Sequence, residues 1–175
     1  MGKRIGILTG GGDVPGLNSV IKEVVYRGTE NNCEIVGIRR GWEGLTHLNR
    51  DDPASSKKYI MPLNRANTRT IDRFGGTILH SSRTNPSKMK ALPPFLTSAG
   101  VTQKGDRWDV SSHVLKNLEW LGFDYLIAIG GDDTLSYAAS LDKLGVKVVA
   151  VPKTMDNDVR NTEYCIGFST AITRA

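Results

Sequence analysis

The chain has 175 residues, of which 39% are hydrophobic and 23% charged, and this length gives room for one domain with a single core. These proportions exclude collagen-like chains and simple disordered chains. Lys and Arg outnumber Asp and Glu by 23 to 18, so the net charge is +5 and anionic partners are favoured. The basic residues are scattered and no RNP-like aromatic motif is present, so we expect no nucleic-acid partner.

Apolar runs, the first residues and the cysteines argue against a membrane or secreted protein. No apolar run approaches the ~20 residues of a membrane span, and the first residues do not form a secretory signal. Cys33 and Cys165 are too few for a disulfide framework, and both lie in apolar local patterns. We therefore expect a cytoplasmic protein with two small, buried thiols.

Strands and helices alternate along the chain. Residues 3–9 predict a short buried strand, residues 17–29 a helix with apolar side chains at helical spacing, and residues 33–39 a second strand. In one sheet, this unit implies a parallel pair of strands with a right-handed crossover.

The alternation returns in the second half of the chain. The predicted order is helix 111–121, strand 124–130, helix 133–144 and strand 147–151. Ser111 or Ser112 is the predicted N-cap of the first of these helices, and Gly145 is predicted to end the second. The whole pattern predicts an α/β fold, Rossmann-like, with a mainly parallel sheet flanked by helices.

Residues 40–105 are less regular. Their many Gly, Pro, Ser and Thr residues predict a surface excursion with short helical pieces and no second domain, and residues 86–106 are the best candidate for a mobile loop. At the other end, GFSTAITRA resembles the first turns of a helix inside which the sequence stops. We therefore expect a fragment, or a chain that relies on another polypeptide.

Three loops rich in Gly or Asp follow predicted strands, and ligands of open α/β sheets bind beyond the carboxyl ends of strands. The first loop, 9–16 (TGGGDVPG), precedes a helix, so its backbone N–H groups and the helix N-terminus suit an anion. The dinucleotide pattern fails at Pro15, and the P-loop pattern fails at Leu17 and Asn18. A phosphate cradle and a purely structural tight turn both remain possible for this segment.

The other two loops carry carboxylates. Asp132 and Asp133 in GGDDT could cap a helix, or could bind Mg²⁺ that bridges phosphates. In PKTMDND (152–158) the two acids could form an Asx turn, or could act as a general base and its helper. Together, the three loops supply the cation, the phosphate site and the proton acceptor that phosphoryl transfer needs.

These residues resemble the phosphofructokinase family. ILTGGGDVPGLN, FGGTILHSSR, IAIGGDD and PKTMDNDV…TEYCIGFSTA match four of its motifs in order, apart from a longer insert near 86–106. The resemblance implies two Rossmann-like domains with the site between them. Residues 1–175 would be the phosphoryl-donor and metal-binding domain, incomplete and without the second, sugar-phosphate domain.

The resemblance assigns roles at the donor side of the site. The backbone of Gly11 and Gly12 would lie against the phosphoryl donor. Arg83 would reach phosphate oxygens of the donor and of the transferring group, although a surface ion pair is the alternative for this side chain. Asp132 would hold Mg²⁺, the cofactor that the resemblance implies.

The resemblance also assigns the acceptor side. Thr154, Met155 and Asp156 would contact the sugar phosphate, with Asp156 as the base for its 1-hydroxyl group. Asp158 would support that base or the metal. Thr154 and Asp156 are matched within the PKTMDND motif.

Two further positions bear on the donor. In ATP-using members of the family, Gly stands at the position of Asp133, and a carboxylate there would clash with the α-phosphate of a nucleotide and repel it. The Lys153 ammonium can neutralise a transferring phosphoryl group or a diphosphate leaving group. Some ATP-using relatives keep this Lys, so only the combination of Asp133 and Lys153 is similar to the diphosphate-dependent class.

The expected reaction therefore transfers a phosphoryl group from diphosphate to the 1-hydroxyl of fructose 6-phosphate, giving fructose 1,6-bisphosphate and phosphate. The alternatives are an ATP-dependent 6-phosphofructokinase and a non-catalytic donor-binding fragment or subunit. The NAD kinase and lipid kinase group shares a GGDGT-like loop, but PKTMDND argues against it. The resemblance implies a homo-oligomer, dimer or tetramer, in the full-length form, and predicts that residues 1–175 alone are inactive.

Overall fold

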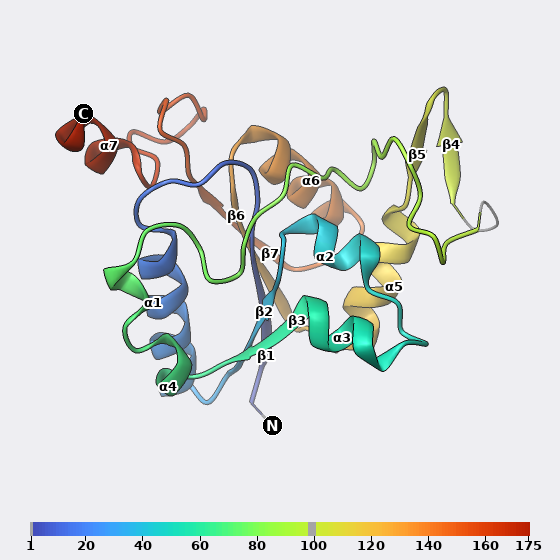
Figure 1. The fold of residues 1–175 in the computed structure, drawn as a ribbon, viewed down its shortest axis with the longest axis horizontal. Helices are drawn as coiled ribbons and strands as arrows, with labels where there is room; N and C mark the ends of the chain where they lie inside the picture. The colour runs from blue at the N-terminus through green and yellow to red at the C-terminus, as the bar shows by residue number, and fades with distance from the viewer. Residues whose placement is uncertain (1, 98–100) are drawn as a thin grey trace.

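A five-stranded sheet organises the chain, and its strand order is β3-β2-β1-β6-β7 (Figure 1). The structure is a computed structural model that describes residues 2–97 and 101–175. The strands are β1 (Arg4–Thr9), β2 (Glu34–Ile38), β3 (Ile60–Leu63), β6 (Tyr125–Gly130) and β7 (Val148–Pro152). β1 pairs in parallel with β2 and β6, and β6 with β7, whereas β3 is antiparallel to β2. The predicted α/β fold with a mainly parallel sheet is confirmed.

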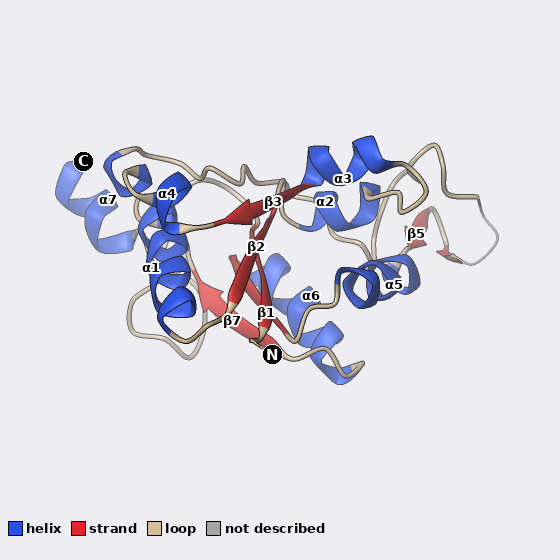
Figure 2. Ribbon diagram, turned by 90° about the horizontal axis from the view of Figure 1, so that it is seen from below, coloured by secondary structure: helices blue, strands red, loops and turns tan. Residues whose placement is uncertain are grey.

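Helices cover both faces of this sheet, and a small hairpin lies apart from it (Figure 2). The larger helices are α1 (Leu17–Glu30), α5 (Ser111–Leu121) and α6 (Asp132–Lys143). Shorter elements are α2 (Trp42–His47), α3 (Pro53–Tyr59), α4 (Arg65–Thr68), the 3₁₀ helix η1 (Ile71–Arg73), α7 (Phe168–Arg174) and the strands β4 (Thr102–Lys104) and β5 (Arg107–Asp109). The periodic segments predicted from the sequence begin and end within a residue or so of these bounds.

The apolar core consists of two clusters, one on each face of the sheet. Neighbouring residues of β1 point to opposite faces, so Ile7 packs with α1 while Leu8 packs with α2, α5 and α6. Both side chains are fully buried. Burial on both faces is typical of a parallel sheet covered by helices, and it leaves the two ends of the sheet as the places where polar loops gather.

Residues 40–105 contribute more to the core than a surface excursion would, so this prediction is wrong in part. Trp42, Leu45, Leu48 and Leu79 are buried, and β3 adds an antiparallel edge strand to the sheet. β3 has only four residues and includes Pro62, which cannot donate to a neighbouring strand and is tolerated at an edge. Its short length and its Pro explain why the local pattern did not indicate a strand.

The segment predicted as a mobile loop, 86–106, contains ordered contacts in its described part. β4 and β5 form an antiparallel hairpin, and the backbone of Met89 exchanges two hydrogen bonds of 2.9 and 2.8 Å with Trp108. Residues 98–100 of this segment lie outside the described residues. Mobility of the segment stays a prediction.

Two local predictions need correction. Neither Ser111 nor Ser112 is the N-cap of α5: the cap position is Val110, and the Asp109 carboxylate accepts a hydrogen bond from the Ser111 N–H at 3.0 Å. Cys165 is buried as expected, but Cys33 is only half-buried. Gly145, in contrast, follows α6 with φ 92°, the left-handed conformation expected where a helix ends.

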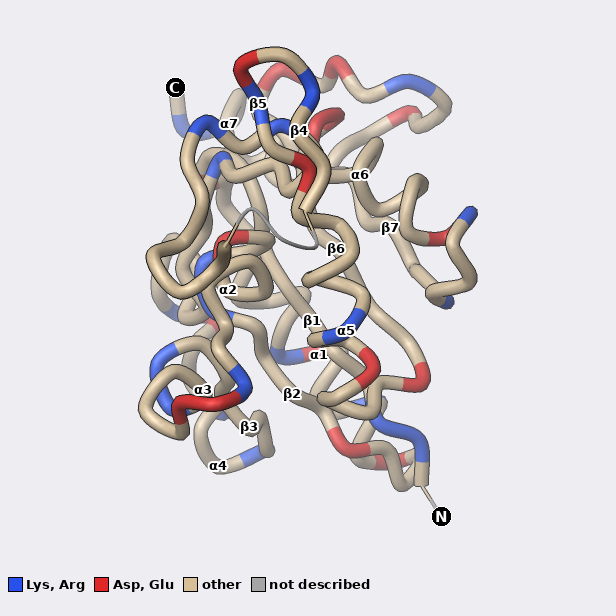
Figure 3. Tube along the Cα trace, turned by 90° about the vertical axis from the view of Figure 1, so that its right-hand side faces the viewer, with Lys and Arg blue, Asp and Glu red and all other residues tan. Residues whose placement is uncertain are grey.

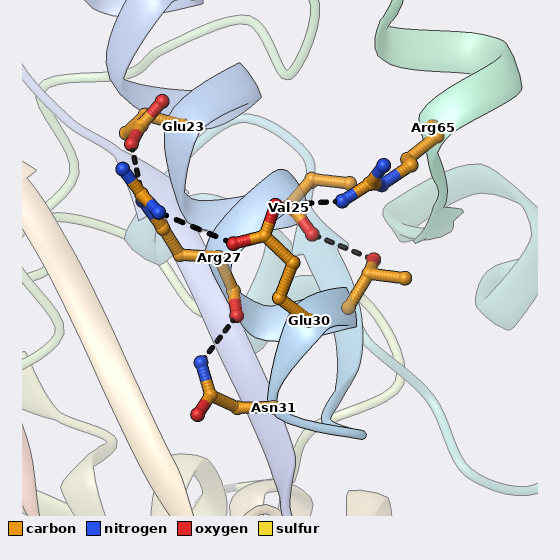
Figure 4. A network of polar contacts seen from close by, with 7 residues as sticks. Glu23, Val25, Arg27, Glu30, Asn31 and Arg65 are labelled. Carbon is orange, nitrogen blue, oxygen red and sulfur yellow. Dashed lines mark hydrogen bonds and ion pairs between the residues drawn. The ribbon is translucent and has the colours of Figure 1, made fainter.

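A polar network ties the β3–α4 segment to the C-terminal end of α1 (Figure 4). Arg27 contacts Glu23 at 2.8 Å and Glu30 at 3.2 Å, and Glu30 in turn accepts from Arg65 of α4 at 2.9 Å. Asn31 donates to the carbonyl of Arg27 at 2.8 Å. These side chains are exposed, so each ion pair contributes at most ~1 kcal/mol to the stability of the fold.

Charge is spread over the molecule, with basic and acidic segments interspersed along the trace (Figure 3). Within the part of the chain that the structure describes, no helix is both long and apolar enough to cross a membrane.

Candidate functional site

A cleft of about 300 Å³ opens at the carboxyl ends of β1, β6 and β7. Its lining residues are Gly11, Gly12, Arg83, Gly131, Asp132, Asp133, Thr134, Lys153, Thr154 and Asp158. The structure thus brings together most of the residues that the sequence singled out. Met155 and Asp156 do not line the cleft, and both are exposed.

The glycine loop after β1 is held by its own backbone. The Gly10 N–H donates to the Ile129 carbonyl at 2.8 Å, and the Gly11 N–H donates to Ser82 at 2.9 Å. Among the described residues, the Gly12 N–H has no such acceptor. Gly11 has φ 80° and Gly16, at the N-cap of α1, has φ 98°, so this path requires glycine. The loop leaves the backbone of Gly12 available to a ligand.

Hydrogen bonds from β1 place the segment that carries Arg83. The buried Thr9 hydroxyl lies 2.8 Å from the His80 carbonyl and 3.1 Å from the Thr77 hydroxyl. Three residues later, Arg83 lines the cleft and makes no ion pair with any other described residue. The alternative of a surface ion pair for Arg83 therefore finds no partner in this part of the chain.

Asp132 and Asp133 form the start of α6, directly after Gly131, which is the N-cap. No side chain caps the helix, so neither carboxylate is used in that way. Both lie in the first turn of the helix, at the positive end of its dipole. The Asp133 carboxylate accepts a hydrogen bond from Asn85 at 2.8 Å, a contact that the sequence pattern did not indicate.

Lys153 is the most unusual charge in the cleft because only 4% of its surface is exposed. Its ammonium donates to the Gly12 carbonyl at 2.5 Å. Burial lowers the pKa of Lys153 from its ordinary value; Asp13 opposes this effect and the positive charge of Arg83 adds to it. Because burial and the charge of Arg83 both disfavour the ammonium form of Lys153, an anion in the cleft would stabilise that form.

The loop after β7 returns to the sheet around Asn157. Its amide donates to the Glu163 carbonyl at 2.9 Å and accepts from the Cys165 N–H at 2.8 Å, and its φ is 53°. The Thr154 hydroxyl accepts from the Asp156 N–H at 3.1 Å, so this stretch does contain a polar turn. The turn uses the Asp156 backbone and leaves the Asp156 and Asp158 carboxylates without hydrogen-bond partners in the described residues.

Thr134 is a cleft residue that the sequence reasoning missed. It is buried, and a Cβ placed on Gly10 would lie 2.5 Å from its hydroxyl oxygen, while one on Gly130 would lie 2.3 Å from its Cβ. Two glycines, one directly after β1 and one at the end of β6, therefore make room for one side chain. The sequence does show a glycine at the end of each of the two strands. Only the parallel pairing of β1 with β6 shows that both glycines face Thr134.

The acids of the cleft suit a magnesium ion that a phosphate helps to hold. Within residues 2–97 and 101–175, no group of three or more His, Cys, Asp or Glu side chains could hold a metal ion alone. Asp132 offers a hard oxygen ligand at the cleft wall. Mg²⁺ commonly binds through one or two carboxylates with phosphate and water oxygens, so the residues fit that mode.

The α/β fold, the glycine loops at its strand ends and the buried lysine beside them are features that suit a phosphate group. The family model described as phosphofructokinase matches residues 4–175. The chain belongs to the phosphofructokinase family.

The similar proteins include users of both donors. The chain is 41% identical to a pyrophosphate--fructose 6-phosphate 1-phosphotransferase of Dictyoglomus thermophilum, over 97% of the chain and 41% of the relative. It is 44% identical to the protein of that name from Amycolatopsis methanolica, over 97% of the chain and 42% of the relative. The chain is 39% identical to an ATP-dependent 6-phosphofructokinase of Natranaerobius thermophilus, over 97% of the chain and 44% of the relative. The chain spans about two fifths of the length of these curated relatives.

A solved structure supports the fold. The Pichia pastoris phosphofructokinase in the T-state superimposes with a TM-score of 0.73 at 21% identity, over 94% of this chain and 15% of that one. At this identity the likeness concerns the fold alone.

The burial of Lys153 predicts a pH dependence of anion binding. Its pKa in the free protein lies below 10.5, and a bound diphosphate would raise it again. At a pH above the pKa that Lys153 has in the free protein, diphosphate binding is then accompanied by protonation of Lys153. The affinity for diphosphate should therefore fall as pH rises through that pKa. In Lys153→Arg the guanidinium stays charged, and we expect the fall to vanish.

Calorimetric titration of both proteins with diphosphate, from neutral to alkaline pH, measures this difference. The ionisation of diphosphate itself is common to both proteins and cancels in the comparison. Superimposable pH profiles would contradict the assigned role of the lysine.

The fit of Thr134 between two glycines predicts a steric effect of Gly10→Ala. The added methyl would meet the Thr134 side chain at 2.5–2.9 Å, and overpacking of this kind costs about 1–3 kcal/mol in the free energy of unfolding. Thr134→Ala in the same chain should recover most of the loss. Gly12→Ala is the matched control, because a Cβ there meets nothing within 4 Å. Urea unfolding of the four proteins tests the expectation, and an equal loss in Gly12→Ala would refute it.

Proposed function

We propose that this chain is the donor-binding part of a diphosphate-dependent phosphotransferase that phosphorylates the 1-hydroxyl of fructose 6-phosphate. The observation that carries the proposal is the presence of Asp133 and Lys153 in the lining of one cleft. The similarity to two pyrophosphate-dependent relatives supports it. The ATP-dependent relative at 39% identity keeps ATP as the alternative donor.

In this proposal the cleft holds diphosphate by backbone and cations. The Gly12 N–H and the Arg83 guanidinium bind its oxygens, and the Lys153 ammonium, with further N–H donors beyond its bond to Gly12, neutralises the phosphate that leaves. Asp132 would hold Mg²⁺, whose charge draws electron density from the phosphate oxygens. Charge stabilisation and positioning supply most of the catalysis in phosphoryl transfer.

The acceptor side of the proposal rests on the loop after β7. Asp156 takes the proton of the sugar 1-hydroxyl as its oxygen forms the new bond to phosphorus, and the bond to the leaving phosphate breaks. Thr154 and Met155 contact the sugar phosphate, and Asp158 supports Asp156 or the metal. Because Met155 is 53% exposed and Asp156 also lies outside the cleft, the sugar would approach from the open side of this loop.

Asp133 determines the donor in this proposal. A diphosphate ends where the α-phosphate of a nucleotide would begin, and a fixed carboxylate at that point repels the longer molecule. A glycine there would remove both the clash and the repulsion.

A donor assay tests the proposed function. The protein at the length that its gene encodes should release phosphate from diphosphate when fructose 6-phosphate and Mg²⁺ are present, and should do so faster than it consumes ATP. Residues 1–175 alone should bind diphosphate but show no turnover. Faster turnover with ATP would refute the proposed donor, and turnover by residues 1–175 would refute the need for further residues.

Asp133→Gly should tighten binding of Mg-ATP by at least ~10-fold, because two unit charges near a protein surface repel by several kcal/mol at contact distance. Calorimetric titration with Mg-ATP measures the change. Asp142→Asn is the matched control, since it removes one negative charge from the same helix at its other end. An unchanged ATP affinity in Asp133→Gly, or the same gain in the control, would show that Asp133 does not exclude the nucleotide.

A further inference from the structure

Asn85 links the insert region to the donor cleft. Its side-chain amide donates to the Asp133 carboxylate at 2.8 Å across 48 residues of sequence. Asp133 is exposed at the first turn of α6, where a free carboxylate would sample several rotamers. The bond from Asn85 selects one of them.

The orientation of the Asn85 amide is fixed by its other hydrogen bonds. Its oxygen accepts from the Ser87 N–H at 3.0 Å and from the Ser87 hydroxyl at 2.8 Å. A reversed amide would set its NH₂ group against the backbone N–H donor of Ser87 and lose that bond. The NH₂ group must therefore face Asp133.

The backbone that carries Asn85 is also held in place. The Lys88 N–H donates to the Asn85 carbonyl at 3.0 Å, which closes a turn. The buried Pro86 accepts from the Val110 N–H at 2.9 Å, at the start of α5, and Met89 pairs with β5. The amide thus reaches Asp133 from a segment fastened to a helix and a hairpin.

We propose that Asn85 is a positioning residue for donor selection, which holds the Asp133 carboxylate in the cleft wall without neutralising its charge. This inference rests on the proposed role of Asp133 in excluding nucleotides. A neutral amide leaves the negative charge in place, whereas Lys or Arg at position 85 would cancel it. Without the amide, the carboxylate can rotate toward solvent and admit a longer phosphate chain.

The variant Asn85→Ser distinguishes the positioning of Asp133 from the part that Asn85 has in its own turn. Serine keeps an oxygen that can accept from the Ser87 N–H and so retains the turn, but it has no donor that reaches Asp133. Asn85→Thr is a second variant of the same kind. Ser87→Ala is the matched control, because it removes one hydrogen bond of Asn85 and leaves the bond to Asp133 in place.

The experiment is a double-mutant cycle on the gene-encoded protein, with the dissociation constant of Mg-ATP as the readout. Asn85→Ser should tighten ATP binding about tenfold when Asp133 is present and by less than about twofold in the Asp133→Gly background. Ser87→Ala should change it by less than about twofold, and thermal unfolding checks that each variant is folded.

Three results would overturn the inference. They are an unchanged ATP affinity in both position-85 variants, an equal gain in the presence and absence of Asp133, and an unchanged ATP affinity in Asp133→Gly itself. Turnover with diphosphate is measured separately, so the proposed reaction can stand while the inference about Asn85 falls.

Discussion

The site depends on one buried cation, the ammonium of Lys153. Transfer of a charged amine out of water is costly unless hydrogen bonds and counter-charges compensate for the lost hydration. Here the Gly12 carbonyl and the more distant Asp13 give only part of that compensation, and Arg83 works against it. An anionic ligand in the cleft would supply the counter-charge that the buried ammonium still lacks.

This placement constrains the three loops together. Lys153 follows β7 but contacts the loop after β1, so its side chain must pass the end of the intervening strand β6. β6 ends at Gly130 and is followed by Gly131, and the Lys153 N–H donates to the Gly130 carbonyl at 3.1 Å. Bulkier residues at this strand end would displace Thr134 and alter the approach of the lysine. The glycines at this end of the sheet therefore have a steric reason.

Local patterns predicted the parts of the molecule that repeat along the chain. Helix α5 matches its predicted range of 111–121, and β1 lies within residues 3–9, because both have strong periodicity and are bounded by polar residues. The pattern missed β3, where four residues with a proline give too short a signal. It also placed the N-cap of α5 on a serine, although the neighbouring Asp109 carboxylate accepts the hydrogen bond.

The candidate site was predicted as three loops, yet their contacts could not be predicted from them. In a parallel sheet, the loops that follow the carboxyl ends of the strands lie at the same edge of the sheet. The sequence was therefore enough to predict that the three loops lie together. The contacts of Asn85 with Asp133 and of Thr134 with Gly10 and Gly130 depend on pairing between distant segments. Local spacing does not encode such pairs, and neither residue belongs to a pattern that spacing alone would select.

The lining of the cleft carries charges of both signs. In the proposed function, Arg83 and Lys153 attract a phosphate, while Asp133 repels the continuation of a phosphate chain. Two unit charges 4 Å apart near a protein surface interact by about 4 kcal/mol, whereas a lost methylene contact is worth about 1 kcal/mol. Charge therefore outweighs shape in choosing between a short and a long phosphate donor, but only if the carboxylate is held in place. In our proposal, the hydrogen bond from the uncharged Asn85 amide holds the carboxylate and preserves the charge on which the choice depends.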